Sequence, residues 1–466
     1  MTTSLENLVA AAQAHRKAGR VSDAIDAWRD VVAVASDNLI YRYNLAAALG
    51  DAGQNAEAAK IVEQVITDGL DRPEAYLVHA RALSGLLDHE RAETAYRAVL
   101  ARRSDDGMAH RELAQLVWMR TGDPDKAEAA IVSAIAQQPE NLTLQVLRAE
   151  FSGQMGDSKK QYSLLQNVLR VAGKDPQVCH FAARAALACK EYAAAHDFAK
   201  IAADAAPENN DTVAVYVTAL LALGDASAAA PVIDRLRARQ PANQYFIALQ
   251  ATAWRLLGDD RYHALFDYDA MVVAAPLDTP KGWATLDAYL NDLSTALTDA
   301  HCHREHPFFL SVRHGSQLPS ITKSENPVMR AYAEAMRGPL AAYTDRIGAG
   351  DDPLRSRNAG APSLLDAWSV SLPPNGFHVN HVHPDGWLSS ACHIRPAADD
   401  PDDSKAGWLK FGEPGCATTP TLGPERYIKP AAGQMVIFPS YMWHGTVPFT
   451  KGEARLTVAA DFAPAG

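Results

Sequence analysis

The sequence lacks the surplus of basic residues that nucleic-acid binding requires. Its 44 lysines and arginines are outnumbered by 55 aspartates and glutamates, which gives a formal net charge of −11. Because proteins neutralise phosphates with a basic surface, this argues against nucleic acid as the main partner. No window approaches the roughly 18 consecutive apolar residues of a membrane span, and no basic-then-apolar leader opens the chain. We therefore expect a soluble protein that does not associate with membranes.

Cysteine is also scarce. The 466 residues include five cysteines, an odd number, and none of them has C-x-x-C spacing. Scattered cysteines of this kind fit reduced thiols better than a disulfide framework, which predicts a cytoplasmic protein. By contrast, 48% of the residues are hydrophobic and 21% are charged, so the chain can bury large cores in two or three domains.

The first half has an internal period. Turn-forming residues recur at intervals of 34 or 35 positions, and an alanine-rich amphipathic segment lies on each side of every turn. The turns are at Gly19, Gly53, Asp88, Gly122, Gly156, Lys190, Gly224 and Gly258. A 34-residue helix-turn-helix period with small residues between paired helices resembles tetratricopeptide repeats. The resemblance covers residues 1–262, about seven repeats, and implies an α-solenoid with a concave groove. That groove is expected to dock a peptide or protein; the alternative is a spacer or a homodimerisation module.

The 34-residue period ends after Tyr262. We expect a helical junction over residues 263–305, followed by a second domain over residues 306–466. Past Gly350 the sequence changes to short β-type runs separated by glycine, proline and aspartate. Six such runs in about a hundred residues predict an antiparallel jelly roll, or double-stranded β-helix, around a cavity. The predicted fold class is thus a multidomain α plus β protein with an N-terminal solenoid and a C-terminal jelly roll.

Possible metal ligands cluster in this second domain. His381, His383 and Asp385 fall within five residues, and His444 follows about sixty residues later. Two histidines and a carboxylate can hold one face of Fe(II) and leave the other open. Strand alternation would put His381 and His383 on one face, with His378 on the other. Two ligand sets remain open, both with His444: His383 with Asp385, or His381 with His383.

A cation follows the last candidate ligand. Arg455 and Thr457 alternate along one predicted strand, so both side chains face the same way. A guanidinium matches a carboxylate bidentately, and a hydroxyl can add a further hydrogen bond. This pair suits the distal carboxylate of a dicarboxylate co-substrate. The alternative is a structural ion pair of Arg455 with Glu453 or Asp461.

Several segments of the second half, including those with the candidate ligands, resemble one known family. Residues 308–463 resemble a 2-oxoglutarate/Fe(II)-dependent oxygenase family that often follows tetratricopeptide repeats. The matching segments are Ser311-Val-Arg-His-Gly315, Gly376-Phe-His-Val-Asn-His-Val-His-Pro-Asp-Gly-Trp387, Gly407-Trp-Leu-Lys-Phe-Gly-Glu-Pro414, Phe438-Pro-Ser-Tyr-Met-Trp-His444 and Arg455-Leu-Thr457. The resemblance implies Fe(II) held by the His-x-His-Pro segment and His444, with 2-oxoglutarate gripped by Arg455. Where the family usually has Tyr-Tyr, this chain has Cys392-His393, and His393 is a candidate replacement donor.

We therefore expect a dioxygenase that hydroxylates a peptide or protein docked by the repeats. Two other functions remain open. One is an oxygenase acting on a small molecule, with the repeats used for assembly. The other is a non-catalytic repeat adaptor carrying a degenerate jelly roll.

Overall fold

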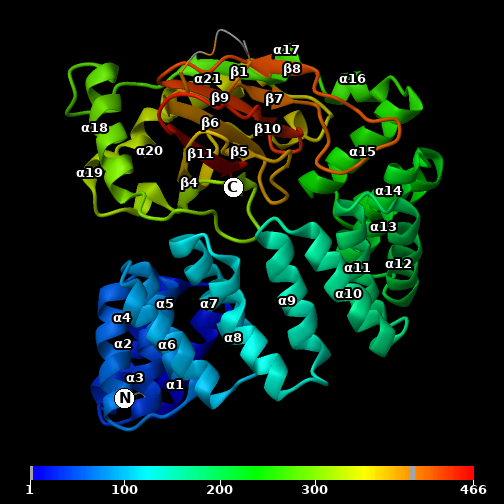
Figure 1. Ribbon diagram of the computed structural model, residues 1–466. Helices are drawn as coiled ribbons and strands as arrows, with labels where there is room; N and C mark the ends of the chain where they lie inside the picture. The colour runs from blue at the N-terminus through cyan, green and yellow to red at the C-terminus, as the bar shows by residue number, and fades with distance from the viewer. Residues whose placement is uncertain (1–3, 399, 401–404, 466) are drawn as a thin grey trace. The chain divides into compact units, whose positions relative to one another are not determined.

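The computed structural model describes residues 4–398, 400 and 405–465 (Figure 1). The chain divides into two compact units, Met1–Phe151 and Ser152–Gly466. This division falls inside the predicted repeat region, and the domain boundaries at residues 262 and 305 stay a prediction. No helix of the described part is long and apolar enough to cross a membrane.

Helix pairs with the predicted period occur in both units. Their helices are α1 (Leu5–Lys17), α2 (Val21–Val34), α3 (Leu39–Asp51), α4 (Asn55–Thr67), α5 (Pro73–Gly85), α6 (His89–Arg102), α7 (Gly107–Thr121), α8 (Pro124–Gln137), α9 (Leu142–Gln154), α10 (Ser158–Ala172), α11 (Pro176–Ala188), α12 (Tyr192–Ala205), α13 (Asn210–Leu223), α14 (Ala226–Arg239) and α15 (Gln244–Leu257). Side chains such as Asp106 and Asn243 cap the helix N-termini, and Gly258 ends α15 in the left-handed conformation. At the turn predicted at Asp88, Leu87 takes the positive φ and Asp88 caps the next helix.

Small residues fill the contacts between paired helices, as the sequence predicts. One cluster of the second unit consists of buried alanines from three successive helices: Ala183, Ala186, Ala195, Ala199 and Ala219. No single pair can cover its own apolar stripe, so within each unit the successive pairs pack on one another. The helical first half is thus of the solenoid type.

Antiparallel sheets dominate the C-terminal region. The largest has the order β1-β9-β6-β11-β4-β3, and two smaller sheets have the orders β10-β7-β8 and β2-β5. The strands are β1 (Val273–Pro276), β2 (Val312–Arg313), β3 (Ser316–Leu318), β4 (Ser363–Leu372), β5 (Phe377–His378), β6 (Leu388–Arg395), β7 (Leu409–Phe411), β8 (Arg426–Ile428), β9 (Gln434–Pro439), β10 (His444–Thr446) and β11 (Arg455–Ala463). All strand pairs are antiparallel, in agreement with the predicted jelly roll.

Further helices, most of them of only four or five residues, lie between α15 and β4 in the chain. They are α16 (Arg261–Leu265), α17 (Tyr268–Met271), α18 (Leu286–Ala300), α19 (Pro327–Arg330), α20 (Tyr332–Ala335) and α21 (Arg337–Ile347), with 3-10 turns η1 (Ile321–Lys323) and η2 (Arg355–Arg357). The segment 263–305 contains the expected helix as α18, and it also supplies β1, which pairs with β9. This segment is therefore partly an edge strand of the main sheet.

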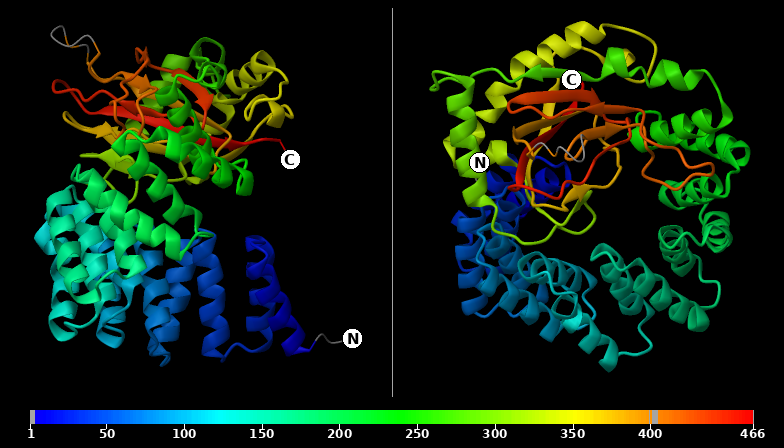
Figure 2. Two further views of the ribbon diagram at one scale, coloured as in Figure 1. Left: turned by 90° about the vertical axis from the view of Figure 1, so that its right-hand side faces the viewer. Right: turned by 45° about the horizontal axis from the view of Figure 1, so that its top comes forward.

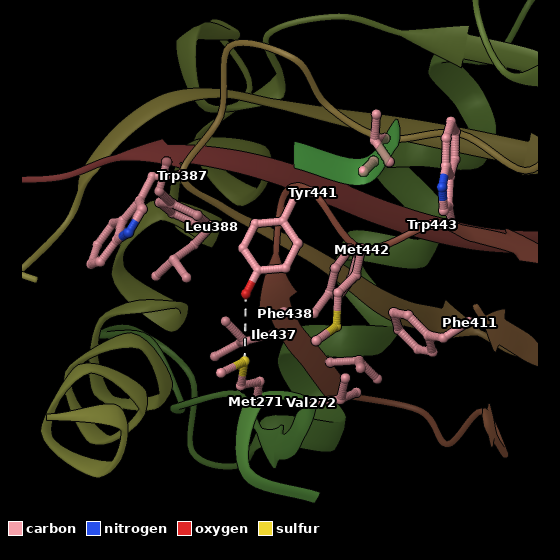
Figure 3. Close-up of a cluster of buried hydrophobic side chains, with 14 of the residues drawn as sticks. Met271, Val272, Trp387, Leu388, Phe411, Ile437, Phe438, Tyr441, Met442 and Trp443 are labelled. Carbon is pink, nitrogen blue, oxygen red and sulfur yellow. Dashed lines mark hydrogen bonds between the residues drawn. The ribbon is translucent and has the colours of Figure 1, made fainter. Parts of the chain in front are cut away.

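The last repeat helices share one hydrophobic core with the sheets. Leu221 of α13 and Leu249 of α15 belong to the same buried cluster as Phe438 and Trp443. Figure 3 shows part of this cluster, including the hydrogen bond from the Tyr441 hydroxyl to the sulfur of Met271 (3.5 Å).

The loop between β7 and β8 adds polar contacts to this packing, and it reaches the repeat helices in the right-hand view of Figure 2. The Thr419 amide donates to the Leu221 carbonyl (3.1 Å) and its hydroxyl to the Ala222 carbonyl (2.6 Å). Arg255 on α15 donates to the Gly412 carbonyl (2.8 Å) and pairs with Glu425 (3.2 Å). The repeat helices from α13 to α15 are therefore built into the β-rich unit.

Candidate metal and co-substrate site

A cavity of about 640 Å³ opens within the β-rich part of the second unit. Its walls come from β4, β6 and β11, from the segment 378–386 and from β10. It lies in the range of about 300–1,000 Å³ that is typical of small-molecule sites. All seven candidate residues from the sequence line it: His381, His383, Asp385, His393, His444, Arg455 and Thr457.

Three histidines converge in this cavity. His381, His383 and His444 each offer a ring nitrogen, and these nitrogens all lie within 4.8 Å of one another. The Nε2 atoms of His381 and His383 are 3.1 Å apart. Two backbone hydrogen bonds between His381 and His444 (2.9 and 3.1 Å) bring the distant segments together. A Cβ atom at Gly445 would lie 3.1 Å from the His378 carbonyl oxygen and 3.2 Å from the Cα of Asn380, so glycine suits this close approach of the two segments.

The other nitrogen of each ring is already held. Nδ1 of His381 lies 2.8 Å from the Val379 carbonyl, and Nδ1 of His444 lies 2.9 Å from the Met442 carbonyl. Nδ1 of His383 lies 2.5 Å from a carboxylate oxygen of Asp461. Carbonyl oxygens only accept, and a carboxylate accepts when ionised, so each Nδ1 is the protonated nitrogen. In a neutral ring with Nδ1 protonated, Nε2 carries the lone pair, and the Nε2 atoms of His381 and His383 face each other. A cation would stabilise this arrangement.

Burial keeps two of these imidazoles, His381 and His444, neutral. It lowers the pKa of His381 to about 3, with a further contribution from His383. Burial and the two neighbouring histidines also hold the pKa of His444 well below its usual value. Neutral rings are the form that binds metal, so protons do not compete for these two nitrogens near pH 7.

Asp385 lies apart from this group. It lines the cavity but is exposed, and the group of converging ligand atoms consists of the three histidines alone. The carboxylate in contact with a candidate ligand is that of Asp461, which also accepts from the Ser389 hydroxyl (2.7 Å). Sequence reasoning considered Asp461 only as an ion-pair partner of Arg455, and that pairing is absent among the described residues.

The prediction that His378 points away from the other histidines is wrong. Its ring stacks on His381 with centroids 5.9 Å apart, and it lines the cavity. The alternation argument fails because β5 ends at His378, so His381 and His383 lie in irregular backbone. Nδ1 of His378 lies 3.0 Å from the Ser311 hydroxyl.

Arg455 lies inside the cavity and is 1% exposed. One of its terminal nitrogens donates to the Gly407 carbonyl (2.9 Å), and its Nε has no partner. Burial lowers its pKa to about 10, which leaves the guanidinium charged at neutral pH. The Thr457 hydroxyl and Nδ1 of His393 are also buried without a hydrogen-bond partner, and the two residues pair across β11 and β6. A buried cation and two free polar groups at one wall form a site suited to an anion.

Helix α15 supports two of the segments that carry the histidines. The Gln244 amide at its start donates to the carbonyl of Pro384, the residue after His383 (3.0 Å). The Trp443 indole, next to His444, donates to the Thr252 hydroxyl (2.9 Å). Thr252 is 2% exposed and Trp443 4%. Sequence reasoning missed these contacts because no local pattern links a repeat helix to a β-turn.

Two regions of the chain match known families. Residues 9–75 and 77–142 match the family "Tetratricopeptide repeat", and residues 366–461 match the family described as "Putative 2OG-Fe(II) oxygenase". The structure of MamA is 18% identical, with a TM-score of 0.30, over 36% of this chain and 92% of that one. A tetratricopeptide repeat protein from Parabacteroides merdae is 12% identical, with a TM-score of 0.37, over 53% and 98%. Yeast Tom70 is 14% identical, with a TM-score of 0.40, over 60% of each chain. No curated protein matches the chain.

Proposed function

We propose that this protein is a 2-oxoglutarate- and Fe(II)-dependent dioxygenase, with the family match of residues 366–461 as the starting point. One observation carries the proposal. Three imidazoles bring ring nitrogens within 4.8 Å of one another in a cavity that also contains a buried, charged arginine without a carboxylate partner among the described residues. A metal cation and an anionic co-substrate would satisfy both features together.

His381, His383 and His444 would hold the metal. Their second nitrogens are fixed by two carbonyls and by Asp461, which orients the rings before any ion binds. The set of His383, Asp385 and His444 is the alternative, and it requires the exposed Asp385 side chain to turn inward. When bound, Fe(II) supplies dioxygen chemistry in which a substrate C–H, 2-oxoglutarate and O₂ become C–OH, succinate and CO₂.

Arg455 would bind the distal carboxylate of 2-oxoglutarate. Its Nε and the Thr457 hydroxyl have no other partner, and Nδ1 of His393 is free for the same anion. The family that the chain resembles usually has a tyrosine at this position. His393 would replace it as the hydrogen-bond donor to 2-oxoglutarate. The low accessibility of these groups, from 1% to 5%, excludes competing water.

The substrate would be a peptide or protein segment. Tetratricopeptide repeats generally mediate protein–protein contacts, which favours a macromolecule over a metabolite. A small-molecule oxygenase and a non-catalytic adaptor are the alternatives. Removing residues 1–141, which carry helices α1 to α8 and leave α9 whole, should reduce turnover of a docked protein but not of a small molecule.

The test compares Arg455→Ala with the unaltered protein after anaerobic reconstitution with Fe(II). We expect stoichiometric iron in both, because Arg455 lies outside the converging histidines. The dissociation constant for 2-oxoglutarate should rise by about 100-fold or more, as expected when a buried charge partner is removed. Unchanged conversion of 2-oxoglutarate to succinate in the variant would defeat the proposal. Absence of stoichiometric iron in the unaltered protein would favour the adaptor.

A further inference from the structure

Much of the cavity lining has no role in the proposal above. The converging histidines, Arg455, Thr457 and His393 account for one part of its wall. A volume of about 640 Å³ leaves room beyond a five-carbon co-substrate. The residues that line the remaining space therefore indicate which kind of second substrate the cavity can bind.

Part of this lining is apolar and exposed. Phe309, Leu310 and Leu365 line the cavity and are 47%, 37% and 46% exposed. Large apolar side chains rarely gather on the surface unless they contact a partner or ligand. These residues can cover an aliphatic chain that enters the cavity.

The charged groups of the lining are mostly acidic. Asp366, Asp385 and Asp461 line the cavity, whereas Arg455 is its one lysine or arginine among the described residues. Asp461 is occupied by His383 and Ser389, and Asp385 is exposed to water. Asp366 differs from both, because its Oδ1 is buried and has no hydrogen-bond partner.

Asp366 lies beside the candidate metal site. On β4 it pairs in register with Asp461, whose carboxylate holds His383. Two positions along the same strand, the Trp368 ring packs against His383 with centroids 5.6 Å apart. A buried carboxylate oxygen without a donor, next to a second carboxylate, is an unfavourable arrangement that a bound cation relieves.

We propose that the cavity binds a protonated amine or guanidinium on an aliphatic stem, with the cation at Asp366 and the stem against Phe309, Leu310 and Leu365. This inference rests on the proposed function and names the chemical class of its second substrate. A lysine or arginine side chain of a peptide has this chemistry, and so does a free alkylamine. The net charge of −11 also favours a cationic ligand.

The test uses three pentapeptides with acetylated N-termini and amidated C-termini. The central residue is lysine, norleucine or glutamate, and the other four residues are glycines. Calorimetric titrations into the full-length protein are run with and without Mn(II) and 2-oxoglutarate. We expect the lysine peptide to bind at least tenfold more tightly than the other two. In Asp366→Asn this advantage should disappear, while norleucine binding stays within twofold. Asp345→Asn, which removes one exposed charge that does not line the cavity, should leave the ratio unchanged.

The outcomes separate the possible conclusions. Equal binding of the lysine and norleucine peptides, no detectable binding of any of the three, or no effect of Asp366→Asn would overturn the inference. If n-butylamine binds as tightly as the lysine peptide, the ligand is a free amine, and tighter peptide binding indicates a side chain. If Mn(II) and 2-oxoglutarate do not bind, the proposed function is refuted. The peptide titrations without them still test the preference for a cation, so the two proposals can fail separately.

Discussion

The contact between Thr252 and Trp443 gives the sharpest prediction, because it joins a repeat helix to the residue beside a candidate ligand. Thr252→Val keeps the size of the side chain and removes the acceptor of the buried indole N–H (2.9 Å). An unpaired buried donor costs about 1–3 kcal/mol, and the stability of the protein should fall by this amount. In the metal-free protein the segment that carries His444 can relax, so binding must restore its position. We expect the dissociation constant for Co(II), followed by its visible absorption in anaerobic titrations, to rise about tenfold.

Thr218 provides a matched control. It is another buried threonine of a repeat helix, 6% exposed, and its hydroxyl donates to the Val215 carbonyl (2.8 Å) within α13. Thr218→Val should lower stability by about 1 kcal/mol and leave the Co(II) dissociation constant within twofold. If the two variants changed Co(II) affinity equally, or if Thr252→Val lowered the melting temperature alone, helix α15 would have no role in placing the ligand.

Three further predictions concern the ligands, the metal and pH. His381→Ala should lose stoichiometric iron by elemental analysis whereas Asp385→Ala should keep it, and the reverse result would establish the His383–Asp385 ligand set. Adding Fe(II) at 100 times its dissociation constant to chelated protein should stabilise the fold by about 2.7 kcal/mol, and an unchanged melting temperature would argue against a preformed site. Burial lowers the pKa of His301 to about 4 from 6.5, with a smaller effect of His303, so the unfolded chain binds the proton more tightly. The contribution of His301 to the free energy of unfolding is complete above pH 6.5 and is lost as the pH falls through 4, by up to about 3 kcal/mol. In urea titrations between these pH values, His301→Gln should make the free energy of unfolding depend less on pH. An unchanged pH dependence would refute the role given to His301.

The repeats and the jelly roll could be predicted from the sequence because both depend on local patterns. A 34-residue period requires only regular spacing of turns, and it holds even where Leu87 or Lys190 takes the positive φ instead of glycine. The strands of the C-terminal region follow from alternating β-branched and apolar residues between turns. The register of β11 also follows from alternation, and it puts Arg455 and Thr457 on the cavity side as expected.

The parts that could not be predicted depend on irregular backbone or on tertiary contacts. Alternation along a strand gave the wrong side for His378 because regular pairing stops at that residue. Asp461 could have been found, since it lies on the same face of β11 as Arg455 and Thr457, at a spacing of six and four residues. The support of Pro384 by Gln244 joins residues 140 positions apart, and no local signal in the sequence indicates it.

The shared core changes how the repeats relate to the site. Helices α13 to α15 were expected to belong to a docking module, yet they pack in one cluster with the strands and hold the segments of two candidate ligands. A ligand bound on these helices would therefore bias the metal geometry through Thr252 and Gln244. Coupling of this kind is reciprocal: if a docked peptide tightened metal binding by some factor, metal-loaded protein would bind that peptide more tightly by the same factor. A factor of one in both titrations would show that a bound peptide does not act on the metal site through these helices.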